Sequence, residues 1–383
     1  MCRCRRRRWP WASDTWPCYW PAVISTACAT GKVPQDSLSP AGPESRYINN
    51  LFWPVFWIAV AVFCLVAGLV LYFVIKYRAK GDDDRPRQVH GSPKLEIAWT
   101  IVPALLLIGV GTFSVMGIFH LARTPKGTPI TLQAAGASGP AIAGDVLDVN
   151  VIAHRWWFEF RYPGLGANGA DLVTAGELHI PTGKNVYLSI TSNEPLNPPT
   201  REGVGPGVIH NFWIPKLAGK IYAVPGRTSH LILNADNPGI YSGQCTEFCG
   251  ISHANMRMRA VAQTDADFAG WVLNQQQPGK VWTAADQFAN AQIYAGYRLF
   301  NGTGTCSGCH TVSGTPAHGQ VGPNLTHLQA RGGFAGFILT LNDANLREWL
   351  RNPQAVKPGA NMVIPKLTED QITALIAYLD TLK

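Results

Sequence analysis

Two uncharged apolar runs set the strongest limit on how this chain can fold. Residues 51–75 (LFWPVFWIAVAVFCLVAGLVLYFVI) and residues 97–121 (IAWTIVPALLLIGVGTFSVMGIFHL) each extend for 25 positions without a charged side chain. About 20 apolar residues in a helix span a bilayer, and uncharged runs of this length are rare in soluble proteins. We therefore predict two membrane-spanning helices, at about 51–77 and 96–121, within a transmembrane hairpin over 47–122.

The excess positive charge of the chain lies beside these runs. The formal net charge is +8, of which residues 1–30 carry +4 and residues 76–94 carry +3. Short loops rich in Lys and Arg stay in the cytoplasm. We therefore predict a two-pass protein of the bacterial inner membrane, with everything after about residue 122 on the periplasmic face. The same distribution argues against a nucleic-acid partner.

The first 46 residues fit no single kind of segment. The cluster Arg5–Arg8 resembles the start of a signal peptide, but the stretch after it is broken by prolines and by Asp14. Two interpretations stay open: a cleavable, lipoprotein-like signal with Cys28 as the acylated residue, or a disordered tail after a misassigned start. We assign residues 1–46 as a signal-like or disordered segment.

Short segments of alternating polarity follow the second apolar run. Residues 146–151, 186–190 and 229–233 alternate in this way and are separated by Gly and Pro, which is typical of an antiparallel β-sandwich or barrel. Asn193–Gly207, rich in Pro and Gly, is predicted to be a long loop. A short helix at about 264–275 ends this all-β domain, to which we assign residues 123–275.

The last part of the chain is predicted to be helical and to bind haem. After a linker at 276–284, a domain of residues 285–383 has amphipathic helices at 287–300 and 368–382. It contains the motif Cys306-Ser307-Gly308-Cys309-His310, in which two thiols can add to the haem vinyl groups while the imidazole binds the iron. Met362, in a loop before the last helix, is the predicted sixth ligand, with His318 or His327 as alternatives.

A second cluster of soft ligands lies in the β region. Two cysteines, two histidines and a methionine make it up: His210, Cys245, Cys249, His253 and Met256. This set suits copper, and two thiolates can bridge two copper ions. A disulfide between the two cysteines, or a tetrahedral zinc site on the Cys and His residues, stays open as an alternative.

Together these motifs resemble a known family. Gly243–Met256, Val208–Pro215 and the aromatic run His154–Phe160 resemble subunit 2 of cytochrome c oxidase over residues 47 to about 275. Residues 285–383 resemble a class I cytochrome c, and the fusion is similar to the caa-type oxidases. The resemblance implies a multi-domain fold: a two-helix transmembrane hairpin, an all-β cupredoxin-like Greek-key barrel, and an all-α class I cytochrome c.

The resemblance also implies roles for individual residues. A dinuclear copper centre, CuA, would be held by His210, Cys245, Cys249, His253, Met256 and the backbone carbonyl of Glu247. The Glu247 carboxylate would bind a Mg²⁺ ion shared with subunit 1. Trp156 would pass an electron from an external cytochrome c to CuA. Glu96 would lie at the entrance of a proton pathway.

These features predict the electron-entry subunit of a haem-copper cytochrome c oxidase. Electrons from cytochrome c or the bc complex would pass through haem c, held by Cys306, Cys309, His310 and Met362, and then through CuA. Subunit 1 would reduce oxygen to water and pump protons, so no catalytic residue is expected here. Subunit 1 and other oxidase subunits are the expected partners. The electron-entry subunit of a CuA-containing nitric oxide reductase is the alternative.

Overall fold

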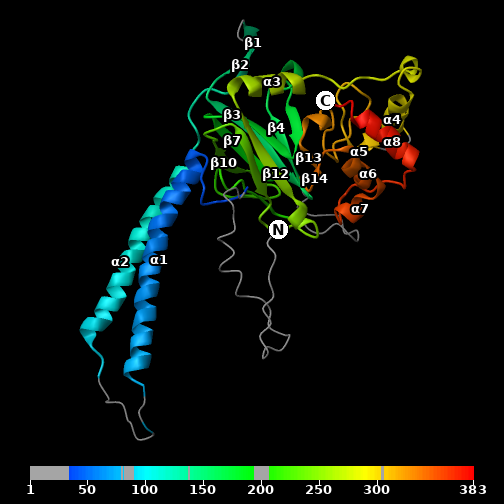
Figure 1. The fold of residues 1–383 in the computed structure, drawn as a ribbon. Helices are drawn as coiled ribbons and strands as arrows, with labels where there is room; N and C mark the ends of the chain where they lie inside the picture. The colour runs from blue at the N-terminus through cyan, green and yellow to red at the C-terminus, as the bar shows by residue number, and fades with distance from the viewer. Residues whose placement is uncertain (1–33, 79–80, 82–89, 137–138, 194–206, 303–305) are drawn as a thin grey trace, which may run out of the picture. The chain divides into compact units, whose positions relative to one another are not determined.

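The computed structural model describes residues 34–78, 81, 90–136, 139–193, 207–302 and 306–383 (Figure 1). The acylation candidate Cys28 and almost all of the loop predicted at Asn193–Gly207 lie outside these residues.

Two long helices form the N-terminal part of the described chain. They are α1 (Pro43–Lys76) and α2 (Pro93–Leu121), and both are long and apolar enough to cross a membrane. Helix α1 begins earlier than the apolar run because Gly42 and Ser45 cap its start and Pro43 occupies its first turn, where proline costs no hydrogen bond. Near the start of α1, the buried Glu44 carboxylate accepts a hydrogen bond of 2.6 Å from Arg123, just beyond the end of α2.

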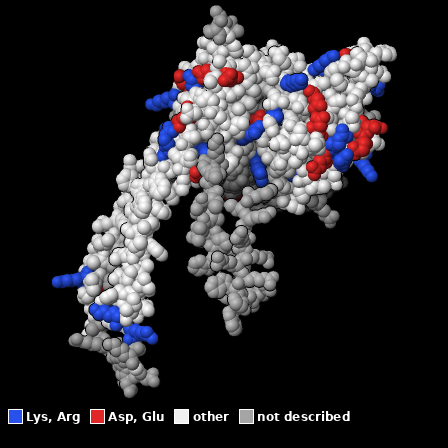
Figure 2. Space-filling model, viewed as in Figure 1, with Lys and Arg blue, Asp and Glu red and all other residues white. Residues whose placement is uncertain are grey.

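Charge is unevenly distributed along this helix pair. Figure 2 shows Lys and Arg at the end where α1 finishes and α2 begins, and an uncharged surface along most of the length between. Lys76, Arg78 and Lys94 are the described basic residues there, and all are exposed. This end of the hairpin therefore carries the positive charge that keeps a loop in the cytoplasm.

Two mixed sheets and several short ribbons form the next part, called the β-domain here (strands β1–β12 with helix α3). The larger sheet has the order β10-β7-β3-β4-β5, with bounds Val146–His154 (β3), Trp157–Tyr162 (β4), Leu172–Ala175 (β5), Asn185–Ser192 (β7) and Ser229–Leu233 (β10). The smaller has the order β11-β12-β6, with bounds Glu177–Pro181 (β6), Gly239–Gln244 (β11) and Arg257–Gln263 (β12). The ribbons pair Thr131–Gly136 (β1) with Gly139–Ala143 (β2), and His210–Phe212 (β8) with Ile221–Ala223 (β9).

The three predicted strands lie within β3, β7 and β10, but the predicted antiparallel pairing is wrong for two neighbours. Strands β3 and β7 pair in parallel, as do β12 and β6. These strands are parallel because the chain passes through the other sheet before it returns to form the pair. A tight hairpin between the two strands would have made them antiparallel. The predicted short helix is α3 (Asp265–Gln275), whose N-cap Thr264 accepts a hydrogen bond from the Asp267 amide.

The C-terminal domain comprises helices α4–α8 and one small ribbon. Their bounds are Ala291–Asn301 (α4), Cys306–Cys309 (α5), Asp343–Arg351 (α6), Pro353–Val356 (α7), Glu369–Leu379 (α8), Gly333–Phe334 (β13) and Leu339–Thr340 (β14). Short 3₁₀ turns lie at Ala167–Gly169, His253–Asn255, Ala284–Gln287 and Leu328–Ala330. Helix α4 begins later than predicted because Thr283 and Asp286 cap a separate 3₁₀ turn before it.

Helices α4 and α8 pack closely at Gly296. A Cβ atom on this residue would lie 1.9 Å from the carbonyl oxygen of Ala374 in α8. Around the contact lie Phe300, Leu375 and Tyr378, all buried in the core of the C-terminal domain. The absence of a side chain at residue 296 therefore sets the distance between the two helices.

We expect Gly296→Ala to destabilise the C-terminal domain by about 1–3 kcal/mol, because the added methyl group pushes α4 and α8 apart. The control is Gly270→Ala in α3, because no atom of a neighbouring segment would lie within 4 Å of the added Cβ and helix propensity favours alanine. Urea unfolding of the full chain in detergent measures both variants. Equal stability of Gly296→Ala and the wild type would contradict the packing.

Candidate metal centre and haem pocket

The five residues predicted to bind copper converge in the β-domain, on and beside the loop of residues 245–256, called the copper loop here. His210 begins β8, while the copper loop joins β11 to β12. The separations are 4.0 Å from His210 Nδ1 to Cys245 Sγ, 3.8 Å from Cys245 Sγ to Cys249 Sγ, 3.5 Å from Cys249 Sγ to His253 Nδ1, and 3.9 Å from Cys249 Sγ to Met256 Sδ. The side chains of all five residues therefore lie in one cluster of soft donors.

The two sulfur atoms are too far apart for the disulfide alternative. A disulfide needs a bond of about 2.05 Å, whereas Cys245 Sγ and Cys249 Sγ are 3.8 Å apart and both thiols are free. The hydrogen bond between them lowers the pKa of the Cys245 thiol to about 4 and raises the pKa of the Cys249 thiol above its usual range. One thiol of the pair therefore keeps its proton while the other is ionised, and both can be thiolates only with positive charge beside them, such as a copper pair would supply.

Glu247 offers its backbone to the same cluster. Its carbonyl oxygen lies 3.3 Å from Cys245 Sγ, while the residue itself is half-buried. The donor set thus fits a dinuclear copper centre, because two histidine nitrogens, one thioether sulfur and one carbonyl oxygen surround the two cysteine sulfur atoms.

Trp156 lies against the copper loop. Its indole Nε1 donates a hydrogen bond of 2.9 Å to the carbonyl oxygen of Cys249, and the residue is only 6% exposed. A Cβ atom on Gly250 would lie 3.1 Å from the indole ring. The aromatic ring predicted as an electron path is therefore in direct contact with a predicted copper ligand.

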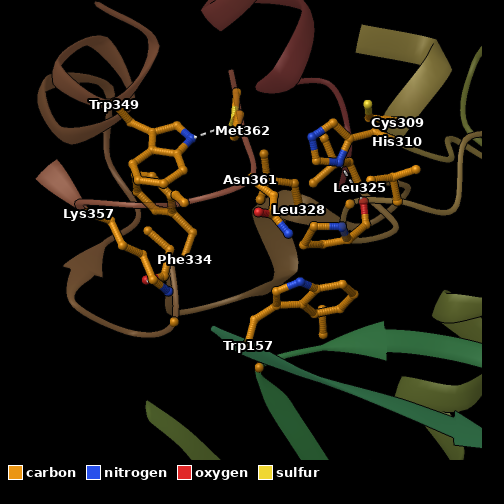
Figure 3. Close-up of a pocket in the computed structure, with 18 of the residues that line it drawn as sticks. Trp157, Cys309, His310, Leu325, Leu328, Phe334, Trp349, Lys357, Asn361 and Met362 are labelled. Carbon is orange, nitrogen blue, oxygen red and sulfur yellow. Dashed lines mark hydrogen bonds between the residues drawn. The ribbon is translucent and has the colours of Figure 1, made fainter. Parts of the chain in front are cut away.

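A cavity of about 580 Å³ lies next to the C-x-x-C-H motif (Figure 3). Cys306, Cys309 and His310 all line it. The Nδ1 atom of His310 donates to the carbonyl oxygen of Pro323 at 2.8 Å, which leaves Nε2 as the atom with a lone pair for iron. Burial lowers the pKa of His310, so the ring is held in the neutral form that binds a metal. The pocket fits a covalently attached haem.

Met362 lines the same cavity, and the two histidine alternatives do not. The Trp349 indole donates a hydrogen bond of 3.1 Å to Met362 Sδ, and Figure 3 shows both residues at the pocket. His327 instead contacts the carbonyl oxygens of Lys383 and Gln277 through its two ring nitrogens. His318 is exposed and is absent from the residues that line the cavity. The geometry favours Met362 as the sixth ligand.

Comparison with known proteins agrees with this geometry. Three family models match the chain: the transmembrane domain of cytochrome c oxidase subunit II over residues 30–116, its periplasmic domain over 147–263, and cytochrome c over 293–383. Cytochrome c oxidase subunit 2 of Alkalihalophilus pseudofirmus is 33% identical over 381 residues and covers 98% of each chain. The chain belongs to the cytochrome c oxidase subunit 2 family. Cytochrome c oxidase subunit 2 of Bacillus subtilis is 30% identical over 366 residues, which are 92% of this chain and 93% of that one.

A solved structure also matches part of this oxidase subunit. The periplasmic domain of subunit II of cytochrome oxidase from Bradyrhizobium japonicum is 25% identical, covers 34% of this chain and 93% of that one, and has a TM-score of 0.29.

Family membership bears on two of the alternatives that the sequence left open. A copper-binding domain and a haem-binding cytochrome c domain follow two membrane helices, and both soluble domains lie on the periplasmic side. The family favours copper over zinc at the cysteine cluster, and the relatives named above are oxidase subunits, which favours the oxidase over the nitric oxide reductase.

Glu96 lies in the first turn of α2, at the cytoplasmic end of the hairpin.

Trp157 is a pocket residue that the sequence analysis did not single out. It begins β4 of the β-domain, yet its side chain faces the haem cavity of the cytochrome c domain (Figure 3). The ring of His154 stacks on it at 4.2 Å, with an angle of 4° between the planes. The aromatic run His154–Phe160 could have suggested this position, but the residues facing it come from a distant part of the chain.

Glu177 is a second residue that the sequence analysis missed. Its side chain is buried in the contact between the two soluble domains, where it accepts hydrogen bonds from Arg259 at 2.7 Å and from the Gly332 amide at 3.1 Å. Burial alone would raise the pKa of its carboxyl group. Contacts with His179 and Arg259 outweigh burial and lower this pKa to about 2. Glu177 is therefore charged and contributes to stability above pH 4.5.

We expect Glu177 to make stability depend on pH in the acid range. The unfolded chain binds more protons than the folded chain between pH 4.5 and about 2, so up to about 3 kcal/mol is lost as the pH falls through this window. Glu177→Gln should be less stable than wild type at pH 6 and should show a smaller loss on acidification. Thermal unfolding of the full chain in detergent measures this.

The matched control for this prediction is Glu369→Gln, because Glu369 pairs with Arg351 on the exposed surface. Exposed ion pairs contribute little to stability, so this variant should follow the wild type. An unchanged acid profile in Glu177→Gln would exclude the buried carboxylate as the source of the effect.

Proposed function

We propose that this subunit relays electrons from a cytochrome c or the bc complex, through haem c and a dinuclear copper centre, to subunit 1 of the oxidase, where oxygen is reduced to water and protons are pumped. The observation that supports the relay most directly is the position of Trp156. This residue lines the haem cavity and also donates a hydrogen bond to the carbonyl oxygen of Cys249 in the copper loop. A single aromatic residue therefore connects the two predicted cofactor sites.

The copper ligands proposed are those that converge in the β-domain: His210, Cys245, Cys249, His253, Met256 and the carbonyl oxygen of Glu247. A copper pair held this way supplies rapid one-electron transfer. Five of these six ligands lie on one short loop between β11 and β12, and the ladder hydrogen bonds of these two strands hold the loop in place. Such a rigid frame keeps the ligand geometry similar in both oxidation states, which favours electron transfer.

The residues proposed to hold haem are Cys306 and Cys309, which would attach it covalently, and His310 and Met362, which would bind its iron. The Pro323 carbonyl fixes the orientation of His310, and the Trp349 indole holds Met362 beside the cavity. Trp156 is covered by the chain's own cytochrome c domain, since a Cβ atom on Gly359 would lie 3.0 Å from its ring. We infer that Trp156 receives the electron from this haem and that a separate cytochrome c delivers to the haem.

Two acidic residues complete the proposal. The Glu247 carboxylate, half-buried between two copper ligands, would hold a Mg²⁺ ion shared with subunit 1. Glu96, exposed in the first turn of α2, would lie at the cytoplasmic entrance of a proton path through subunit 1. The domain limits proposed are 47–122 for the hairpin, 123–275 for the copper domain, 276–284 for the linker and 285–383 for the cytochrome c.

We expect Cys249→Ser to abolish the electron paramagnetic resonance signal of an electron shared between two coppers, because one of the two thiolates that would hold both coppers is lost. Haem c should remain attached and reducible. Cys64→Ser is the control, since Cys64 is an exposed thiol of α1, away from the cluster. Copper spectra that are the same in Cys249→Ser and the wild type would overturn the copper assignment.

We expect Met362→Ala to keep the haem covalently attached but to change its spin state and lower its reduction potential, because the thioether ligand is removed. Optical spectra and a redox titration measure both effects. Lys366→Ala is the control, since Lys366 is exposed and is not among the residues that line the cavity. A wild-type spectrum in Met362→Ala would mean that another residue binds the iron.

A further inference from the structure

A buried lysine joins the cytochrome c domain to the copper domain. Lys357 follows α7 and is only 4% exposed. Its Nζ donates hydrogen bonds to the carbonyl oxygens of Trp156 at 2.6 Å and of Ala335 at 2.9 Å. The first carbonyl belongs to the copper domain and the second to the cytochrome c domain. Burial lowers the pKa of Lys357 to about 7. Whether charged or neutral, a buried amino group costs free energy unless it is hydrogen-bonded, so its position is set by these two acceptors.

The residues after Lys357 lie directly on the copper loop. The hydroxyl of Ser252 donates a hydrogen bond of 2.5 Å to the carbonyl oxygen of Pro358. Gly359 has a φ of +78°, and a Cβ atom there would lie 2.5 Å from Ile251 and 3.0 Å from the Trp156 ring. Only glycine fits at this position, because both the backbone conformation and the available space exclude a side chain.

The same segment ends at the proposed haem ligand. Residues 357–362 are called the methionine loop here. Hydrogen bonds with the Gln354 side chain hold this loop in place. Gln354 Oε1 accepts a hydrogen bond of 3.0 Å from the Gly359 amide, while Nε2 donates to the carbonyl oxygens of Ala360 and, at 3.4 Å, of Met362. The contact with the copper loop and the ligand at the haem are therefore parts of one braced segment.

We propose that Lys357 is a positioning residue for electron transfer within this chain: it fixes the methionine loop against Trp156 and the copper loop, and so sets the distance between haem c and copper. This inference rests on the proposed function. Electron tunnelling falls exponentially with distance, so a small displacement of the loop slows transfer without altering either cofactor. No electron passes through Lys357 itself. It holds the backbone carbonyl of Trp156, whose ring contacts the copper loop.

The first test is Lys357→Met, which keeps the length of the side chain and removes its donor. We expect haem c to CuA electron transfer, followed in the full chain after flash reduction of haem c, to slow by about tenfold or more. Amide hydrogen exchange in the copper loop should rise, since the contact that covers it is lost. Copper and haem spectra should stay as in the wild type, and Lys357→Arg should restore part of the rate.

The matched control is Lys366→Met, which removes an equal charge from an exposed lysine just beyond the methionine loop. It should leave both the transfer rate and the hydrogen exchange unchanged. A Lys357→Met chain with a wild-type rate and wild-type protection of the copper loop would overturn the proposal. A Lys366→Met chain that slows as much as Lys357→Met would also overturn it, because charge alone would explain the effect.

A second variant keeps the inference testable if Lys357→Met fails to fold. Gly359→Ala should displace the methionine loop from Trp156 and Ile251 and slow transfer in the same way. Gly169→Ala is its control, because Gly169 has a nearly equal φ of +76° and no atom of another residue would lie within 4 Å of the added Cβ, its two chain neighbours aside. A wild-type transfer rate in Gly359→Ala would contradict the proposal.

Failure of this inference differs from failure of the proposed function. A wild-type chain that binds no copper, or in which reduced haem c never reduces copper, would refute the relay itself. If the relay operates in the wild type and both loop variants transfer at its rate, the relay stands and the role of Lys357 falls.

Discussion

The hydrogen bond from the Trp156 indole to the Cys249 carbonyl is the contact on which the arrangement of the two redox sites depends. It fixes an aromatic ring against the loop that carries five of the six proposed copper donors. The other side of that ring meets Gly359 of the cytochrome c domain. The copper loop and the methionine loop both contact this indole. The same side chain therefore defines how each domain is positioned against the other.

Two buried polar side chains with partners across the boundary hold this contact together. Glu177 of the copper domain accepts a hydrogen bond from the backbone of the cytochrome c domain, and Lys357 of the cytochrome c domain donates to the backbone of the copper domain. Each charge is costly to bury and is compensated only when its partners are in place. Displaced arrangements of the two domains would leave these groups without compensation, which favours one arrangement.

Buried hydrogen bonds also attach the membrane hairpin to the copper domain. Arg123, after α2, donates to the buried carboxylate of Glu44 near the start of α1, and the rings of Tyr47 and His120 stack at 4.0 Å beside it. The Ser45 hydroxyl reaches the carbonyl oxygen of Lys216 in the copper domain at 2.7 Å. Both helices are therefore joined to each other and to the copper domain at their periplasmic end, while Lys76, Arg78 and Lys94 are exposed at the other end.

The sequence by itself determined the local chemistry of this protein. Uncharged runs predict the two membrane helices. The C-x-x-C-H motif and the Cys245–Met256 spacing predict haem and copper donors, because these signals depend on residues close together in the chain. Only the tertiary structure decided which distant groups meet. Parallel pairing of β3 with β7, Trp157 in the wall of the haem pocket, and buried Glu177 and Lys357 all depend on contacts between remote segments. A lysine beside Pro358 and Gly359 looks like a solvated loop residue until the fold places the Trp156 carbonyl next to it.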